Sequence, residues 1–458
     1  MGFIAAIPGL IALFIALQRS PARAFLDVYI PVVLLFPEYY RWVLPALPDP
    51  TFSQSAILPI AVIYLLKEGG KWQVSLMDFL IVGFAICVGV SQYTNAGFGE
   101  AQNLMFDMIG SIVLPYVAAK GLIEPKGLRV QFARRFVILL FAICILSLYE
   151  FKMGSTPWRL LLGRFFPGQG DGWITTFRYG FARVAGPYGH AILAGLILIV
   201  GFRVQRWLEW SGHWESRFRL LPSLNFSKAR VITFGLVAGI LMTLVRGPWL
   251  GGFAGALFTA AGLPRNRKRA LLGVGAVIIA VGIPATYAFY SYASVGRAAA
   301  KSDSQETAAY RFELVTKYFD IAMQKRALGW GLTTWPKVSG MPSIDNYYLL
   351  LALMHGFIAD GFLITMILVM IFRLIRHDMK LPPPQRRGSS LGFTLAGIYV
   401  AIGVTIATVF LGTNAVPVFA VITGWSEGYL LSRPDSLTAT QSLQSRTPRP
   451  FAFRRVIA

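Results

Sequence analysis

The sequence contains few charged residues, few histidines and almost no cysteine. Only 14% of its 458 residues are charged, whereas 55% are hydrophobic. Because a soluble domain carries about 25% charged residues, this chain lacks the side chains that would cover a soluble surface. The two cysteines, Cys87 and Cys144, lie within apolar runs, which predicts buried hydrophobic residues and no disulfide or metal pair. The four histidines are too scattered for a zinc site.

Apolar runs occupy most of the chain instead. Runs of roughly 17–25 residues are long enough to cross a bilayer as helices. We therefore predict an all-α polytopic membrane protein with twelve or thirteen transmembrane helices, of which the first two are short enough to form a hairpin or an interfacial segment. The runs lie near residues 3–17, 24–36, 53–66, 74–91, 104–119, 136–149, 187–202, 230–245, 248–263, 270–290, 344–372, 391–412 and 415–431.

The formal net charge is +22, and the basic residues are distributed unevenly among the loops. In a soluble protein this charge would indicate nucleic acid, but the hydropathy excludes that class. If residues 53–66 cross from outside to inside, about two thirds of the 43 Lys and Arg residues lie in cytoplasmic loops, as the positive-inside rule predicts. Residues 1–431 would then form the transmembrane domain, and the basic cytoplasmic tail 432–458 is expected to be disordered or to lie on anionic lipid. Residues 1–17 lack the basic start of a cleavable signal peptide.

Positive charge on the outer side runs against this rule and needs a separate explanation. The outer basic residues concentrate in the loop 151–186, at Arg246 and in the loop 291–343. Clustered arginines suit a diphosphate, because the guanidinium group is a rigid fork of donors that stays charged. A face of this kind would attract an anionic lipid-linked diphosphate.

Arg246 is the most constrained of these residues. It lies in "LVRGPWLGG", between two apolar runs that we expect to be joined by only a Gly-Pro-Trp turn. Its side chain must therefore stay near the membrane surface. Two interpretations are open, since the side chain either extends to lipid headgroups or binds a diphosphate.

The outer loop 291–343 contains a predicted helix. Ser302 with Gln305, or Asp303 with Glu306, forms a capping pattern. Apolar residues then recur at helical spacing, which predicts an amphipathic helix on the membrane surface or over the bundle. The predicted apolar face consists of Ala308, Phe312, Val315, Phe319 and Ala322.

Asp345 and Asn346 stand immediately before the long apolar run 344–372. Asp345 is either a helix N-cap, whose oxygen accepts a backbone N–H, or a general base that takes a hydroxyl proton. A cap would itself place the carboxylate at the edge of a cavity lined by arginines. His190 and His355 are weaker candidates, because a lone histidine in a membrane helix is more often a packed, hydrogen-bonded residue.

Four segments in order along residues 183–372 carry recognisable features. "RVAGPYGHAILAG" (183–195) has an Arg-x-x-Gly pattern that opens a helix, and "LMTLVRGPWLGGFAGAL" (241–257) has a Thr-x-x-Arg-Gly turn. "YRFELVTKYFDIAMQKRALGWGL" (310–332) combines an amphipathic helix with a Gly-x-Gly turn, and "IDNYYLLLALMHGFIADGFLITMI" (344–367) has an Asp-Asn-x-x-Leu start and a mid-helix glycine. Together they resemble the O-antigen ligase and polysaccharide polymerase superfamily of bacterial inner membranes.

The resemblance implies a type C glycosyltransferase-like fold, a periplasmic active face and no metal or other cofactor. The implied donor is a glycan on undecaprenyl diphosphate, and the implied partners are membrane lipids and other polysaccharide-assembly proteins, such as a flippase and a chain-length regulator. Asp345 replaces the histidine that activates the acceptor in the ligases. Because a carboxylate also accepts a proton, transfer chemistry is retained, and we predict a polymerase of exopolysaccharide or O-antigen.

In the mechanism that the resemblance implies, Arg183, Arg246 and Arg311 hold the donor diphosphate and stabilise its charge as it leaves. Asp345 orients or deprotonates the acceptor hydroxyl, which attacks the anomeric carbon with inversion. Further candidate substrate-binding residues are Arg178, His190, Asn346, Arg297, Arg326, Trp330 and Trp335. For the additional arginines the alternative is a solvated loop charge, and for the tryptophans it is interfacial anchoring.

Three other functions stay open at this point. A ligase would transfer a finished glycan to lipid A core and would share the same site. A transporter or flippase would show internal repeats and midplane sites made of broken helices, and no convincing repeat is present. A non-catalytic scaffold has little in the sequence to motivate it.

Overall fold

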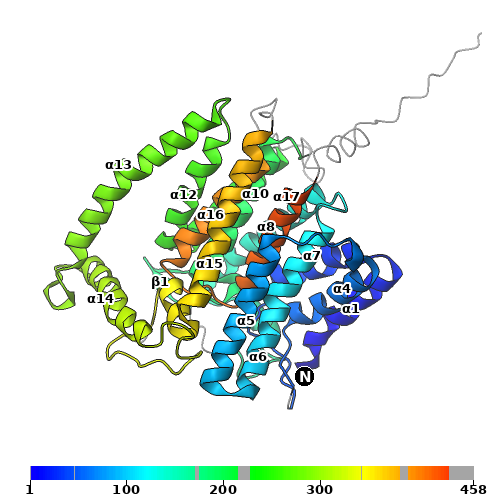
Figure 1. Ribbon diagram of the computed structural model, residues 1–458, viewed down its shortest axis with the longest axis horizontal. Helices are drawn as coiled ribbons and strands as arrows, with labels where there is room; N and C mark the ends of the chain where they lie inside the picture. The colour runs from blue at the N-terminus through cyan, green and yellow to red at the C-terminus, as the bar shows by residue number, and fades with distance from the viewer. Residues whose placement is uncertain are drawn as a thin grey trace, which may run out of the picture.

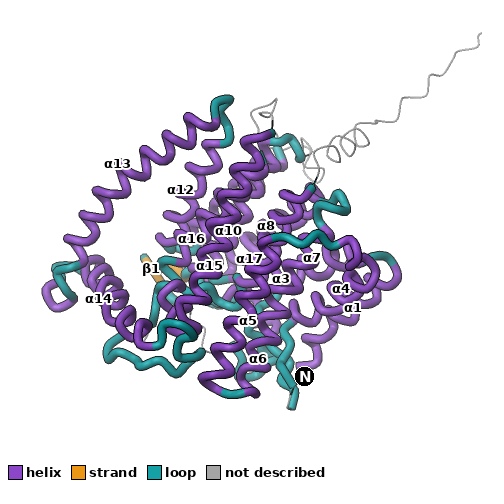
Figure 2. Tube along the Cα trace, in the orientation of Figure 1, coloured by secondary structure: helices purple, strands orange, loops and turns teal. Residues whose placement is uncertain are grey.

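The computed structural model describes residues 2–45, 47–170, 175–214, 227–341, 343–381 and 390–432. Its regular structure is almost entirely helical, and the strands described form one short hairpin (Figures 1 and 2). The N-terminal half contains η1 (Gly2–Ala6), α1 (Ile7–Gln18), α2 (Pro21–Ala24), the π-helix η2 (Phe25–Tyr29), α3 (Ile30–Leu35), α4 (Phe52–Glu68), η3 (Gly69–Lys71), α5 (Leu76–Ala96), α6 (Phe98–Met108), the π-helix η4 (Ile109–Val113), α7 (Leu114–Leu122), α8 (Arg129–Met153) and α9 (Pro157–Leu162).

The second half begins with the hairpin and continues in long helices. Its elements are β1 (Phe177–Arg178), β2 (Phe181–Ala182), η5 (Gly186–Tyr188), α10 (Ala191–Trp210), α11 (Lys228–Met242), α12 (Arg246–Ala261), α13 (Arg267–Ala293), η6 (Arg297–Ala299), α14 (Asp303–Gln324), α15 (Tyr347–Lys380), α16 (Leu391–Ile406) and α17 (Val416–Leu431). The predicted tail lies outside the described residues from position 433 onward.

The prediction of an all-α polytopic membrane protein is confirmed. Each predicted apolar run coincides with helical structure. Six helices of the described part are long and apolar enough to cross a membrane: Leu76–Ala96, Phe98–Leu122, Arg129–Met153, Ala191–Trp210, Arg267–Ala293 and Tyr347–Lys380. Gly2–Gln18, Leu391–Ile406 and Val416–Leu431 are shorter apolar helices. Both cysteines are buried and free, as predicted.

Glycine and alanine let the central helices approach closely. A Cβ on Gly255 of α12 would lie 2.2 Å from the carbonyl oxygen of Gly397 in α16, and a Cβ on Gly424 of α17 would lie 2.3 Å from that of Tyr116 in α7. Lipid tails are as apolar as the helices, so helix association in a membrane depends on close packing of this kind. These pairs form the middle of the bundle, and α15 packs between α5 and α16 (Figure 1).

Helix α15 is interrupted at Gly356, whose φ of 79° is not helical. The loop that follows α14 fills the interruption with its backbone. The N–H groups of Trp330 and Gly331 donate to the carbonyls of Leu353 and Met354, each at 2.8 Å. The N–H of Phe357 returns a bond to this loop, to the carbonyl of Arg326 at 2.8 Å. This loop therefore pairs with the carbonyls of Leu353 and Met354 and with the N–H of Phe357, backbone groups on either side of the break.

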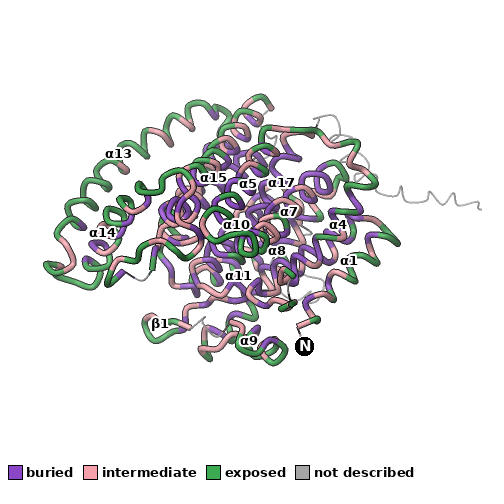
Figure 3. The backbone as a smooth tube through the Cα atoms, turned by 60° about the horizontal axis from the view of Figure 1, so that its bottom comes forward, coloured by how far each residue is buried: buried purple, intermediate pink, exposed green. Residues whose placement is uncertain are grey.

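Helix α13 stands apart from the bundle at the left of Figure 1, and Figure 3 shows it exposed along its length. Only Arg267 and Ala293, at its two ends, are buried. It leads from α12 to α14, which packs against α15. The amphipathic helix α14 is therefore joined to the bundle at its two ends by α13 and α15.

The predicted helix in the loop 291–343 is present as α14, and Ser302 caps it by accepting a bond from the N–H of Gln305 at 3.2 Å. Its predicted apolar face is partly wrong. Val315 and Phe319 are 41% and 46% exposed, whereas Leu314 and Tyr318 are buried. The Tyr318 side chain packs inward because its hydroxyl donates to the carbonyl of Met341 at 2.9 Å, a partner that helical spacing does not reveal.

Candidate active site

The loop between α8 and α10 forms a compact platform at one end of the bundle. Its hairpin turns at Tyr179 and Gly180, where φ is 55° and 79°, and positive φ at both central residues is typical of a two-residue hairpin turn. Arg178 donates from Nη1 to the carbonyl of Leu244 at 2.8 Å. The N–H of Val184 donates to the carbonyl of Met242 at 3.2 Å. The platform is thereby attached to the turn between α11 and α12.

Arg246 is the first residue of α12, and its side chain is exposed. The prediction of a Gly-Pro-Trp turn is wrong, because the turn lies earlier, in residues 243–245. Pro248 belongs instead to the first turn of α12, where no intrahelical N–H donor is required. The start of α12 lies beside α10, because a Cβ on Gly195 would be 3.1 Å from side-chain atoms of Val245 and Pro248. The helix starts that carry His190 and Arg246 are therefore neighbours.

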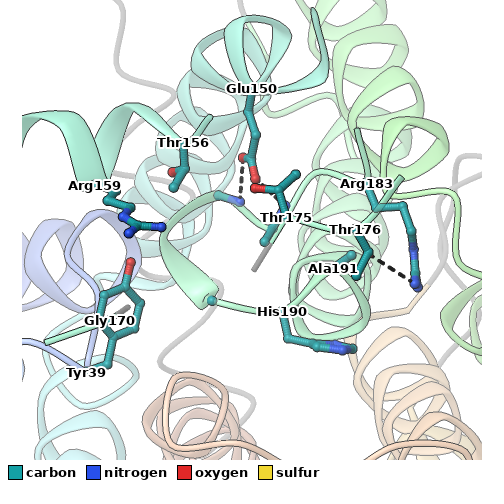
Figure 4. A pocket seen from close by; sticks show the side chains of 13 residues that line it. Tyr39, Glu150, Thr156, Arg159, Gly170, Thr175, Thr176, Arg183, His190 and Ala191 are labelled. Atoms are coloured by element: carbon teal, nitrogen blue, oxygen red, sulfur yellow. Dashed lines mark hydrogen bonds between the residues drawn. The ribbon is translucent and has the colours of Figure 1, made fainter. Parts of the chain in front are cut away.

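A cavity of about 240 Å³ opens in this platform. Figure 4 shows Arg159 and Tyr39 on one side of it, Arg183 and His190 on the other, and Glu150 between them. The cavity is lined by Tyr39, Glu150, Thr156, Arg159, Gly170, Thr175, Thr176, Arg183, Ala185, Gly186, Gly189, His190 and Ala191. Two guanidinium groups among hydroxyl and backbone groups make it suited to an anionic, hydroxyl-rich ligand.

Arg183 is half-buried beside this cavity. Its Nη1 lies 3.4 Å from the Thr176 hydroxyl, and its buried Nε has no hydrogen-bond partner. Burial, and after it the charge of Arg178, lowers the pKa of the Arg183 guanidinium. A partly buried cation with an unused donor is stabilised by an anion, so Arg183 is a candidate anion-binding group of the cavity.

His190 caps α10, and its Nδ1 accepts the backbone N–H of Ile192 at 3.2 Å. Burial lowers the pKa of the ring, the Arg183 charge lowers it further, and the Asp345 charge acts in the opposite direction. His190 therefore lies within electrostatic range of both a guanidinium and a carboxylate. Its role as a cap accounts for its position without requiring it to bind substrate.

Asn346, and not Asp345, is the N-cap of α15. Its Oδ1 accepts the N–H of Leu349 at 3.2 Å. Asp345 instead accepts a bond from the Ser343 hydroxyl at 2.7 Å and acts electrostatically on His190 and Tyr310. The capping interpretation of Asp345 is thus wrong, and its carboxylate lies within electrostatic range of His190 in the platform.

Arg311 lies on α14 and is exposed. It precedes Leu314 by three residues and Tyr318 by seven, so it lies on the side of α14 that packs toward the start of α15. Its neighbour Tyr310 donates to the carbonyl of Ser343 at 2.8 Å, two residues from Asp345. The chain just before Asp345 is therefore attached to α14 next to Arg311, and no bond between Arg311 and Asp345 is described.

Arg297, Trp330 and Trp335 have structural contacts. Arg297 pairs with Glu306 at 3.4 Å and donates to the carbonyl of Gly340 at 3.3 Å. Trp330 donates from Nε1 to the carbonyl of Ile321 at 3.1 Å, and Lys325 lies over its ring at 4.4 Å. Trp335 packs on the cluster around Tyr318. These contacts brace the segment between α14 and α15.

Arg326 and His355 belong to the same loop-and-helix junction. The Arg326 side chain is exposed, and its backbone carbonyl accepts the N–H of Phe357 at this junction. His355 is buried, with Nδ1 at 3.0 Å from the hydroxyl of Ser91, as expected for a packed histidine. Neither residue lines the cavity.

Hydrogen bonds connect the platform to the N-terminal segment, which is the chain between α3 and α4. Asn414 accepts the N–H of Glu38 at 2.7 Å and donates to the carbonyl of Tyr188 at 2.9 Å. The side-chain amide of Gln169 accepts the backbone N–H of Arg41 at 2.8 Å and donates to the backbone carbonyl of Arg41 at 3.0 Å. The chain between α3 and α4 thereby contributes Tyr39 to the cavity wall.

Glu150, Tyr39, Thr156 and Arg159 were not predicted as site residues. Glu150 carried a usable signal, since an acidic residue at the end of an apolar helix is functional more often than average. The others come from loops whose meeting depends on tertiary packing. Among the described residues, no group of three or more His, Cys, Asp or Glu side chains is arranged to hold a metal ion.

A family model described as O-Antigen ligase matches residues 231–360. No curated protein gives a match to the sequence. The matched range runs from α11 into α15 and contains Arg246, Arg311 and Asp345, while Arg183 and the platform precede it. Residues 231–360 are therefore similar to the O-antigen ligase family, which is consistent with the ligase and polymerase superfamily and with a membrane glycosyltransferase of that type.

Proposed function

We propose that this protein is a glycosyltransferase of the bacterial inner membrane that joins glycan units carried on undecaprenyl diphosphate into a polysaccharide. In this proposal the platform faces the periplasm, and the C-terminus lies in the cytoplasm. The donor diphosphate binds at Arg183, Arg246 and Arg311, and no metal takes part.

One observation carries the proposal. His190 is subject to the charges of both Arg183 and Asp345, so a guanidinium and a carboxylate lie within electrostatic range of one ring at the start of α10. An inverting transfer needs these two groups close together, one for the leaving diphosphate and one for the attacking hydroxyl.

The transfer itself forms one bond and breaks one. The acceptor hydroxyl oxygen attacks the anomeric carbon of the donor glycan, and its proton passes to the Asp345 carboxylate. The bond from the anomeric carbon to the diphosphate oxygen breaks, and the electron pair leaves on the diphosphate. The arginines stabilise this charge, an effect worth about 3 kcal/mol for one well-placed donor.

The test uses purified protein in nanodiscs with an undecaprenyl-diphosphate-linked repeat unit as the sole substrate. Wild type is expected to give a ladder of products, which Asp345→Ala and Arg246→Ala abolish. Asp320→Ala, an exposed acid on α14, and Arg376→Ala, an exposed arginine in the last part of α15, are the matched controls and should leave the ladder intact. Equal loss in the controls would contradict the named site.

The same assay separates the alternatives. The matched family model is described as O-Antigen ligase, which favours a ligase as the second candidate. Transfer that occurs only when a lipid A core acceptor is added would establish the ligase. Protein-dependent movement of the lipid across a bilayer, without turnover on either acceptor, would replace both by a transporter.

A further inference from the structure

The segment from Arg183 to Gly186 is held through four consecutive backbone donors. The N–H of Arg183 donates to the carbonyl of Thr176 at 2.8 Å, and that of Val184 donates to Met242. The next two donors, on Ala185 and Gly186, have no carbonyl partner and bind the two oxygens of Glu150, at 3.0 and 2.9 Å. Half of this anchorage therefore depends on one side chain.

Glu150 reaches this position from the last turn of α8 and is 1% exposed. Burying a carboxylate is costly unless hydrogen bonds compensate for lost water. A neutral amide would be cheaper to bury, but it offers only one acceptor oxygen and would turn an N–H toward the second backbone donor. The geometry thus requires the carboxylate.

The turn that Glu150 holds cannot easily hold itself. Gly186 and Gly189 have φ of 57° and 72°, in the left-handed region that glycine adopts freely. The turn separates Arg183 from His190, whose ring is subject to the Arg183 charge. Its geometry decides how these two side chains stand relative to each other across the cavity.

We propose that Glu150 is a positioning residue, which fixes the Ala185–Gly186 turn so that Arg183 and His190 are presented together to the donor diphosphate. This inference rests on the proposed function, because it assumes that a diphosphate binds there. Glu150 itself acts through the turn and does not touch the reacting atoms.

The experiment measures binding of undecaprenyl diphosphate, the unglycosylated product, to the full chain in nanodiscs. Glu150→Gln is expected to weaken binding roughly tenfold, as the loss of a charge-assisted hydrogen bond would. Glu427→Gln is the matched control, since Glu427 is a fully buried carboxylate that pairs with Arg373 at 2.7 Å in another part of the bundle. It should lower thermal stability while leaving binding unchanged.

A double variant separates positioning from general destabilisation. If Glu150 acts through the Arg183 segment, Glu150→Gln should weaken binding much less in an Arg183→Ala background than alone. Equal losses in both backgrounds, or wild-type binding by Glu150→Gln, would overturn the positioning role and leave the proposed function standing. Absence of binding by wild type would overturn both.

Should Glu150→Gln fail to fold, Glu150→Asp replaces it. The shorter side chain keeps the charge but cannot reach both donors, so weakened binding with retained folding is expected. Wild-type affinity in that variant would overturn the proposal.

Discussion

Gly329 and Gly356 touch through their backbones, and a Cβ on Gly329 would lie 2.6 Å from the amide nitrogen of Gly356. A Cβ on Gly356 would in turn lie 2.1 Å from the carbonyl oxygen of Ala327. Both residues have positive φ, 64° and 79°. The loop after α14 therefore fits into the interruption of α15 only because neither position carries a side chain.

Gly356→Ala is expected to destabilise the protein by roughly 2–4 kcal/mol, from steric overlap and an unfavourable φ. Gly361→Ala, in the same helix, is the control, because a Cβ there meets nothing within 4 Å. It should be neutral or slightly stabilising, since alanine favours a helix over glycine. Thermal unfolding in detergent compares the two, and equal losses would contradict the packing described.

Stability and activity should separate at the start of α15. Asn346→Ala removes the N-cap and should cost about 1 kcal/mol of stability. Asp345→Ala removes no cap, so we expect wild-type stability with loss of transfer activity. Melting curves and product ladders of both variants check this, and a destabilised Asp345→Ala would argue that the carboxylate has a structural role instead.

Glu38 should make stability depend on pH. Burial raises its pKa from 4.5 to about 7, although hydrogen bonds from Ser53 and Thr51 act against the rise. The folded protein therefore keeps a proton that the unfolded chain releases. The contribution of this retained proton to the free energy of unfolding is fully present below about pH 4.5 and is lost as pH rises through about 7.

The test compares wild type with Glu38→Gln, whose amide stays neutral. Between pH 4.5 and pH 7.5, the unfolding temperature of wild type should fall relative to that of the Glu38→Gln variant. A difference that is independent of pH would show that Glu38 is not protonated in the folded state.

Asn414 should be important for the platform although it does not line the cavity. Asn414→Ala leaves the N–H of Glu38 and the carbonyl of Tyr188 unpaired, which should cost about 1–3 kcal/mol. Asn103→Ala, at an exposed position of α6, should have little effect. Chemical or thermal unfolding distinguishes the two, and equal stability would contradict the bridge between the N-terminal segment and η5.

The sequence could predict where the apolar helices and their caps lie, because hydropathy and capping patterns are local features of the chain. Apolar runs located the helices of the bundle, the capping pattern located α14, and the basic residues that the sequence assigned to the outer side pointed to the segments that contain Arg183 and Arg246. The same reasoning misjudged Val315 and Phe319, since helical spacing alone does not distinguish the lipid face from the face covered by a neighbouring loop. It also left capping open for Asp345 when Asn346 is the cap, because adjacent Asp and Asn are equally suited to that position.

By itself, the sequence determined an all-helical membrane protein, its order of helices and its arginine-rich segments, since hydropathy and helical periodicity are local properties. Only the tertiary structure decided which carboxylates matter. Glu150 reaches two donors that lie 35 and 36 residues away, and Asn414 joins two segments that lie 376 and 226 residues before it in the chain. Such contacts depend on how whole helices pack, and the cavity exists because α8, α10 and the N-terminal segment meet there.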